Sequence, residues 1–231
     1  MTESAADAFA VPLSLPCEHG LLHGRLTQVA AAAGLVILAH DCAANDVRDE
    51  ILAGRLRRAG LSTLSIDLLA RQEEQFADVH NNVPLLARRL IDFLDLVRKR
   101  MLIGELAEQP LGLWAAHATA PAAVRVAALR DHDIAAVVCL GGLIDLAGML
   151  YLRTLAAPLL VLVEETDARL VVSNSRALQE VHEPKALKLI PEIGIEFAAS
   201  TGFEIDSDEA SVWFSEHFGA VSSVGGRQNL S

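Results

Sequence analysis

Histidine and aspartate residues stand at three places where a short apolar run of the sequence ends. His40 and Asp41 follow one such run, His117 follows a second, and Asp167 comes shortly after a third. Imidazole titrates near neutral pH and can act as a base or a nucleophile, and a carboxylate can orient it or join it as a ligand of a divalent metal. If the runs are parallel strands, their carboxyl ends meet at one edge of a sheet, so these four residues can line one pocket.

The pattern around these residues predicts an α/β fold. Runs that are apolar at nearly every position indicate strands covered by helices on both faces, and helical spacing marks the segments between them. The predicted strands are 11–17, 21–29, 35–39, 61–67, the run before His117, 134–140, 159–163 and 185–190. The predicted helices are 47–59, 84–101, an alanine-rich helix after His117, 170–182 and 206–218. This alternation predicts a mostly parallel sheet with right-handed crossovers and an N-terminal antiparallel hairpin at one edge.

The length of 231 residues suits one such domain. We expect an N-terminal extension over 1–10, a single domain over 11–218, and a flexible, Ser- and Gly-rich C-terminal tail over 219–231. The polar segment 68–82 is predicted to be mobile.

The charge and cysteine content exclude several classes of function. With 30 acidic and 19 basic residues the net charge is -11, which argues against nucleic-acid and membrane-surface binding. No apolar run approaches the ~20 residues of a membrane span, and the start of the chain does not have the pattern of a signal peptide. Cys17, Cys42 and Cys139 have neither paired nor metal-ligand spacing. We therefore expect a cytoplasmic protein with free thiols, no metal and no cofactor.

The run from Gln109 to Ala123 reads as a strand, a very tight turn and an alanine-rich helix. Here the chain resembles the α/β-hydrolase superfamily, and within it the dienelactone-hydrolase-like members, over about 11–218. Further landmarks of that family occur in the expected order, namely His40 at a strand end, Gly141-Gly142, the acid turn at Asp167, and Leu189-Ile190-Pro191. The resemblance implies a three-layer α/β-hydrolase sandwich.

The same resemblance implies a serine-hydrolase triad in the order nucleophile, acid, histidine. The nucleophile position holds His117, the acid position keeps Asp167, and the histidine position falls at Ile195. Family members carry a G-x-S-x-G elbow, whereas Ala115 and Thr119 stand here where glycine is usual. No histidine occurs between positions 182 and 217, so the loss does not depend on the register of the alignment. An aspartate alone cannot activate a hydroxyl that is absent.

The resemblance also implies an oxyanion hole formed near His40, Asp41 and Cys42, together with Ala118 after the nucleophile position. The Asp41 carboxylate is expected to oppose a developing negative charge there. Cys42 is either a reactive thiol or, as we expect, a small passive residue. The cluster 131–133 resembles a coupled acid–base group, but it precedes a strand on the side away from the expected site, so we interpret it as a charged turn.

Three hypotheses of function follow. The first is a catalytically degenerate α/β-hydrolase, a pseudoenzyme kept for binding a small ligand or a protein partner, or for assembly. The second is an active hydrolase with a rewired site, built from His117 and Asp167 or assisted by a metal. The third is a structural subunit whose acidic surface, segment 68–82 and tail contact a basic partner or a second copy of the chain.

Overall fold

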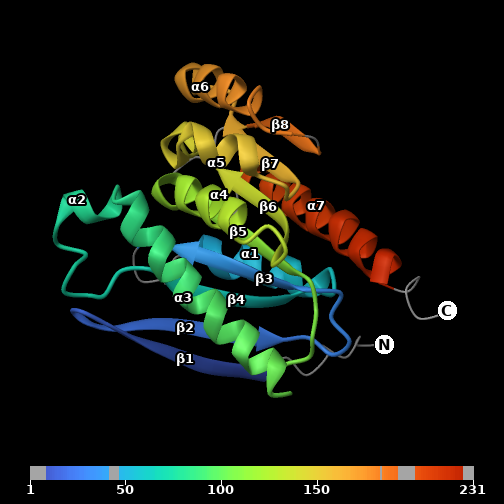
Figure 1. Ribbon diagram of the computed structural model, residues 1–231. Helices are drawn as coiled ribbons and strands as arrows, with labels where there is room; N and C mark the ends of the chain where they lie inside the picture. The colour runs from blue at the N-terminus through green and yellow to red at the C-terminus, as the bar shows by residue number, and fades with distance from the viewer. Residues whose placement is uncertain (1–8, 42–46, 183, 192–200, 226–231) are drawn as a thin grey trace.

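The computed structural model describes residues 9–41, 47–182, 184–191 and 201–225, and a single eight-stranded sheet runs through them (Figure 1). Its strands are β1 (Phe9–Cys17), β2 (Gly20–Gln28), β3 (Leu35–His40), β4 (Ser62–Asp67), β5 (Leu111–Ala116), β6 (Ile134–Leu140), β7 (Leu159–Glu164) and β8 (Lys185–Ile190). They lie in the order β1-β2-β4-β3-β5-β6-β7-β8. β1 and β2 pair antiparallel, as do β2 and β4, and all other neighbours pair parallel. The predicted N-terminal edge hairpin and parallel sheet are confirmed.

Helices cover both faces of the sheet and complete a three-layer sandwich (Figure 1). They are α1 (Val47–Arg58), α2 (Ala77–His80), α3 (Val83–Leu102), α4 (Ala120–Leu129), α5 (Met149–Thr154), α6 (Ala168–Leu178) and α7 (Thr201–Gly225), with 3-10 turns η1 (His117–Thr119) and η2 (Ile144–Ala147). The core between the sheet and α3, α4 and α6 is the larger one, and a second core lies under α1 and α7.

The strand β3 shows why its sequence is apolar at every position. Ile37 and Ala39 contribute to the core under α3 and α4, while Val36 and Leu38 contribute to the core under α1 and α7. Successive side chains of a strand point to opposite faces, so a strand covered on both sides has no solvent-facing position.

The helix α7 packs directly against the backbone of β5, the strand that leads to His117. A Cβ atom on Gly112 would lie 2.6 Å from Cε1 of Phe214 and 2.8 Å from Cζ of Phe218. Both phenylalanines are buried, with rings 5.6 Å apart. Glycine is needed at 112 because any side chain would collide with these rings.

The two ends of the domain differ from the expected boundaries. β1 begins at Phe9, inside the segment expected to be an extension, and α7 spans Thr201–Gly225 where a helix over 206–218 and a tail from 219 were expected. The weak apolar pattern of 219–225 does not stop the helix, because a nucleated helix gains one hydrogen bond for each residue it adds. Residues 226–231 lie outside the described part of the chain.

The segment 68–82, which the sequence predicts to be mobile, is tied to α3 in its central part by a buried ion pair. Glu73 is 5% exposed and Arg89, on α3, is 2% exposed. The Arg89 guanidinium donates to both oxygens of the Glu73 carboxylate at 2.6 Å and to the carbonyl of Leu68 at 2.7 Å. The hydrogen bond from Arg89 lowers the pKa of Glu73, while burial acts in the opposite direction. A polar segment is held here because its acidic residue meets a buried cation from another element.

Candidate functional site

The turn between β5 and α4 carries His117 at its tip. His117 has a φ of +50°, the left-handed region, and its side chain is exposed. Histidine tolerates this region better than most residues that carry a side chain. The strand, the sharp turn and the helix therefore form an elbow, as the sequence predicts.

Thr119 closes this elbow from inside, at a position where the family usually has glycine. Its hydroxyl accepts a hydrogen bond from the Ala116 amide at 3.1 Å. The same hydroxyl lies 2.9 Å from the Ala116 carbonyl and 3.0 Å from the Ala39 carbonyl on β3, to either of which it can donate. Thr119 is 2% exposed, so these bonds are shielded from water. The threonine thus joins the turn to the neighbouring strand through a side chain.

A cavity of about 220 Å³ opens beside the tip of the elbow. It is lined by Asn81, Val83, His117, Ala118, Pro121, Gly141, Gly142, Leu143, Leu146 and Leu170. A Cβ atom on Gly141 would lie 3.0 Å from Nδ1 of His117, so the imidazole lies over the turn that follows β6. Of the predicted site residues, His117 and Ala118 are brought together in this cavity. We call it the elbow pocket.

Asp41 makes a contact that the sequence does not predict. Its Oδ2 atom lies 3.0 Å from Nδ1 of His80, the last residue of α2. The carboxylate therefore has an imidazole as its partner, and the expectation that it opposes negative charge at an oxyanion hole stays a prediction. No pattern in the sequence marks this pairing, because the partners are 39 positions apart.

His40 belongs to the opposite face of the sheet. It follows Val36 and Leu38 in the alternation of β3, and its Nδ1 lies 3.4 Å from Oδ2 of Asp49 on α1. Its ring centroid is 6.2 Å from that of Trp114, another residue of the core under α7. His40 is 8% exposed and is not among the residues that line the elbow pocket.

Asp167 lies at the end of β7, where its role is local. Its Oδ1 accepts a hydrogen bond from the Leu170 amide at 3.0 Å and caps α6. Leu170 in turn lines the elbow pocket. Within the described residues no hydrogen bond or ion pair joins Asp167 to His117, so the structure places this aspartate near the pocket but not on the histidine.

Two predicted site residues, Cys42 and Ile195, lie outside the described residues. Of the other cysteines, Cys17 and Cys139 carry free thiols. Burial raises the pKa of Cys139 to about 12, so this thiol remains protonated and unreactive at neutral pH.

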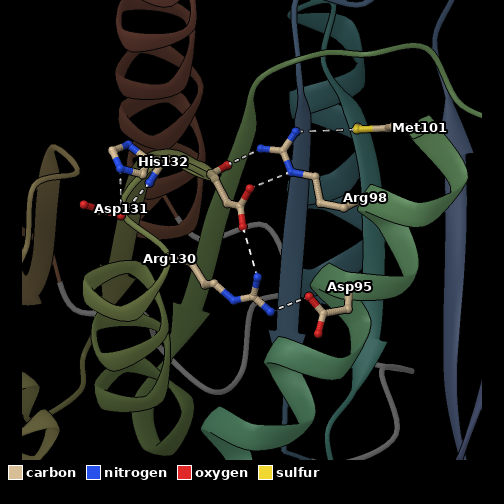
Figure 2. Close-up of polar contacts among 7 residues, drawn as sticks. Asp95, Arg98, Met101, Arg130, Asp131 and His132 are labelled. Atoms are coloured by element: carbon tan, nitrogen blue, oxygen red, sulfur yellow. Dashed lines mark hydrogen bonds and ion pairs between the residues drawn. The ribbon is translucent and has the colours of Figure 1, made fainter.

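The cluster 131–133 forms a charged turn, as the sequence predicts (Figure 2). Asp133 precedes β6 and pairs with Arg98 of α3 at 3.0 Å and with Arg130 at 3.4 Å. The side chain of His132 is 97% exposed beside Asp131. The turn lies at the amino end of β6, whereas His117 follows the carboxyl end of the parallel strand β5, so the two are at opposite edges of the sheet.

The described part of the chain contains no group of three His, Cys, Asp or Glu residues close enough to hold a metal ion. Among the same residues, no helix has the length and apolar character that a membrane span needs.

The arrangement of strands, elbow and helices matches known structures. Over 91% of this chain and 98% of the other, it superposes on a dienelactone hydrolase from Anabaena variabilis with a TM-score of 0.81 and 29% sequence identity. The chain has a dienelactone-hydrolase-like α/β-hydrolase fold. The similarity to Est1E from Butyrivibrio proteoclasticus (TM-score 0.70, 11% identity, 90% of this chain, 99% of that one) shows the fold alone. The similarity to carboxyl esterase 2 from Tuber melanosporum also shows the fold alone (TM-score 0.72, 12% identity, 94% of this chain, 89% of that one).

Sequence comparison relates this dienelactone-hydrolase-like chain to longer proteins. It is 31% identical over 196 residues, 84% of its length, to two Mycobacterium tuberculosis proteins whose names assign them provisionally as phosphoribosyl transferases. The chain spans only 43% of the length of these relatives. No model of a protein family matches the sequence.

Sequence reasoning missed part of the pocket wall. Asn81 and Val83 come from the segment leading into α3, and Leu170 comes from the first turn of α6. The sequence contains signals for the starts of both helices, Pro84 for α3 and the residues after Asp167 for α6. Both helices begin at the same edge of the sheet. What was missing is that the start of α3 folds over the elbow.

Proposed function

We propose that this dienelactone-hydrolase-like chain is catalytically degenerate and uses the elbow pocket to bind a small ligand. The observation that carries the proposal is the histidine in the nucleophile position, whose exposed imidazole lies over Gly141 at the pocket. A serine hydroxyl at this place would attack an ester carbonyl, whereas this chain carries an imidazole there.

The loss of the other triad functions supports the proposal. Asp167 uses Oδ1 to cap α6, and among the described residues no hydrogen bond or ion pair reaches the His117 imidazole. The position where the family has its catalytic histidine holds Ile195. An imidazole without a carboxylate partner lacks the group that fixes its tautomer and stabilises its charged form.

The chemistry of the lining defines the ligand class. Val83, Pro121 and three leucines supply apolar contact, whereas His117 and Asn81 supply polar side chains at the pocket. The volume of about 220 Å³ is below the ~300–1,000 Å³ of typical ligand pockets. A small, mostly apolar molecule with one polar end fits this arrangement.

A hydrolysis assay with 4-nitrophenyl acetate tests the catalytic part of the proposal. We expect the purified chain to show no turnover above buffer, with or without added zinc, and we expect His117→Ser to remain inactive because a base is still absent. His117→Ala and Asp167→Ala serve as matched variants. Activity abolished by both of these substitutions would establish the second hypothesis, a hydrolase rebuilt around His117, and strong activity in His117→Ser would also contradict the proposal.

Binding of small aromatic probes tests the other part. We expect benzoate or its neutral analogue benzamide to shift the NMR signals of the His117 ring saturably, since either molecule has an apolar body and one polar end. Ala118→Leu places a larger side chain in the pocket and should abolish the shift, whereas Leu129→Ala, on the exposed end of α4, should not change it. If neither probe shifts the His117 signals, the elbow pocket is not a site for this class of ligand.

The activity named for the Mycobacterium tuberculosis relatives is a separate matter. A phosphoribosyl donor carries several phosphate charges, which proteins usually hold with arginine, lysine or a bound magnesium ion. The lining of the elbow pocket contains neither a basic Lys or Arg side chain nor a carboxylate. We therefore assign that activity to the part of the relatives that this chain does not match.

A further inference from the structure

The ring of His80 faces two hydrogen-bond acceptors. Nδ1 lies 3.0 Å from Oδ2 of Asp41, at the end of β3, and Nε2 lies 3.0 Å from the carbonyl oxygen of Glu74. A carboxylate and a carbonyl have no hydrogen to donate, and a neutral imidazole has only one N–H. Both contacts can be hydrogen bonds only when His80 is an imidazolium ion.

The charges around His80 act in the same direction. The charged groups that face His80 are the carboxylates of Asp41 and Glu74, and both raise its pKa. The hydrogen bond to the Glu74 carbonyl raises the pKa of His80, and the contact with Asp41 raises it further, while partial burial acts in the opposite direction. The geometry and the local charge thus favour the same protonated form.

His80 lies next to the wall of the elbow pocket. It is the last residue of α2, Asn81 follows it, and Val83 begins α3. Asn81 and Val83 both line the pocket. Between them, the Asn82 side chain accepts a hydrogen bond from the Leu85 amide at 3.1 Å and caps α3. A bond that holds His80 to the end of β3 therefore also fixes where this wall stands relative to the elbow.

We infer that His80 is a positioning residue that ties α2 to the end of β3 in its imidazolium form and so makes the shape of the elbow pocket depend on pH. The ligand-binding consequence rests on the proposed function, whereas the contact itself does not. His80 acts through Asn81 and Val83, and it is not itself among the pocket-lining residues.

The direction of the pH dependence follows from the raised pKa. A histidine whose pKa is higher in the folded protein than in the unfolded chain contributes its full stabilisation below the unfolded value, near 6.5. That contribution is lost as the pH rises through the higher, folded value. The pocket wall is therefore held most firmly in mildly acidic solution, and probes of the pocket should bind more weakly in alkaline solution.

NMR titration of the histidine rings in the full chain tests the inference without any ligand. We expect His80 to titrate above the ordinary value and Asp41→Asn to lower its midpoint by roughly one pH unit, because the neutral amide no longer stabilises the positive charge. The exposed His132 provides the internal control, and its midpoint should not change in Asp41→Asn. A His80 midpoint at or below the ordinary value, or one that Asp41→Asn leaves unchanged, would overturn the inference.

A second measurement tests whether His80 sets the position of Asn81 and Val83 or only forms a local contact. The backbone amide signals of Asn81 and Val83 should shift with pH at the same midpoint as His80. These shifts should disappear in His80→Gln, because the glutamine amide can donate hydrogen bonds but cannot titrate. His132→Gln is the matched control and should leave them unchanged. If the amides titrate but benzoate and benzamide do not bind, the positioning role of His80 stands and the proposed ligand site fails. If the amides do not follow His80, the positioning role fails whatever the probes do.

Discussion

Replacing Glu73 by alanine is expected to lower the free energy of unfolding by about 3–5 kcal/mol, because Arg89 would remain buried without its partner. The two side chains are 5% and 2% exposed, and two hydrogen bonds of 2.6 Å join them. The same carboxylate accepts a bond from the Ala70 amide at 2.9 Å, which the variant would also lose. Urea unfolding at neutral pH, followed by circular dichroism, measures the effect.

A surface ion pair of the same residue types provides the control. Glu105 lies 3.8 Å from Arg100 and its side chain is 56% exposed. Exposed pairs of this kind contribute only ~0–1 kcal/mol, so Glu105→Ala should hardly change stability. Similar losses in Glu73→Ala and Glu105→Ala would show that burial of the Arg89 pair is not what stabilises the segment.

The pH dependence of stability in a second variant, Glu73→Gln, tests the charge directly. Arg89 holds the pKa of Glu73 below its ordinary value of 4.5. A carboxyl group of this kind stabilises the protein above its unfolded pKa, and the stabilisation is lost as the pH falls through the folded pKa. Glu73→Gln should therefore lose less stability than the wild type when the pH is lowered from 6 into this range, roughly below 4.5.

Phe214→Ala is expected to destabilise the chain by about 3–5 kcal/mol, the range observed for large-to-small changes in protein cores. The Phe214 ring is fully buried where α7 meets the backbone of β5, in contact distance of the Gly112 position. Its removal leaves a cavity directly behind the strand that carries the elbow. Thermal and urea unfolding would both report the loss.

Phe76→Ala is the matched comparison for this substitution. Phe76 is 52% exposed, so the same change of side chain removes little buried surface and leaves no enclosed cavity. Its expected effect is within about 0.5 kcal/mol. A loss of comparable size in both variants would mean that the contact of α7 with β5 contributes little to stability.

The sheet was largely predictable from local pattern. The strand 134–140 was predicted at its observed bounds, and the strands near 35 and 159 were predicted to within one residue. These strands are covered on both faces, so their sequences are apolar throughout and stand out from their neighbours. The length of α7 and the short α5 were not predicted, because neither has a strong apolar period in the sequence.

The site was predictable only where it depends on neighbours in the chain. The elbow could be located from the residues 109–123 alone, since strand, turn and helix are consecutive. The side-chain pairs that hold the segments around the elbow could not be predicted from the sequence. Asp41 and His80 are 39 positions apart, and Glu73 and Arg89 are 16 positions apart. Several acids and bases compete for each partner in a chain with 30 acidic residues, and only the fold selects between them.

The hydroxyl of Thr119 makes glycine costly at this position of the elbow. A G-x-S-x-G elbow in this chain would first need Thr119→Gly, and then also Ala115→Gly and a serine at 117. That first step alone removes the bonds that the hydroxyl makes to the Ala116 amide and to a neighbouring carbonyl, which leaves buried polar groups unpaired at a cost of ~1–3 kcal/mol each. The threonine hydroxyl therefore works as a fixed brace of the turn, and glycine at 119, which would give the turn a freer backbone, would carry that loss of stability in this chain.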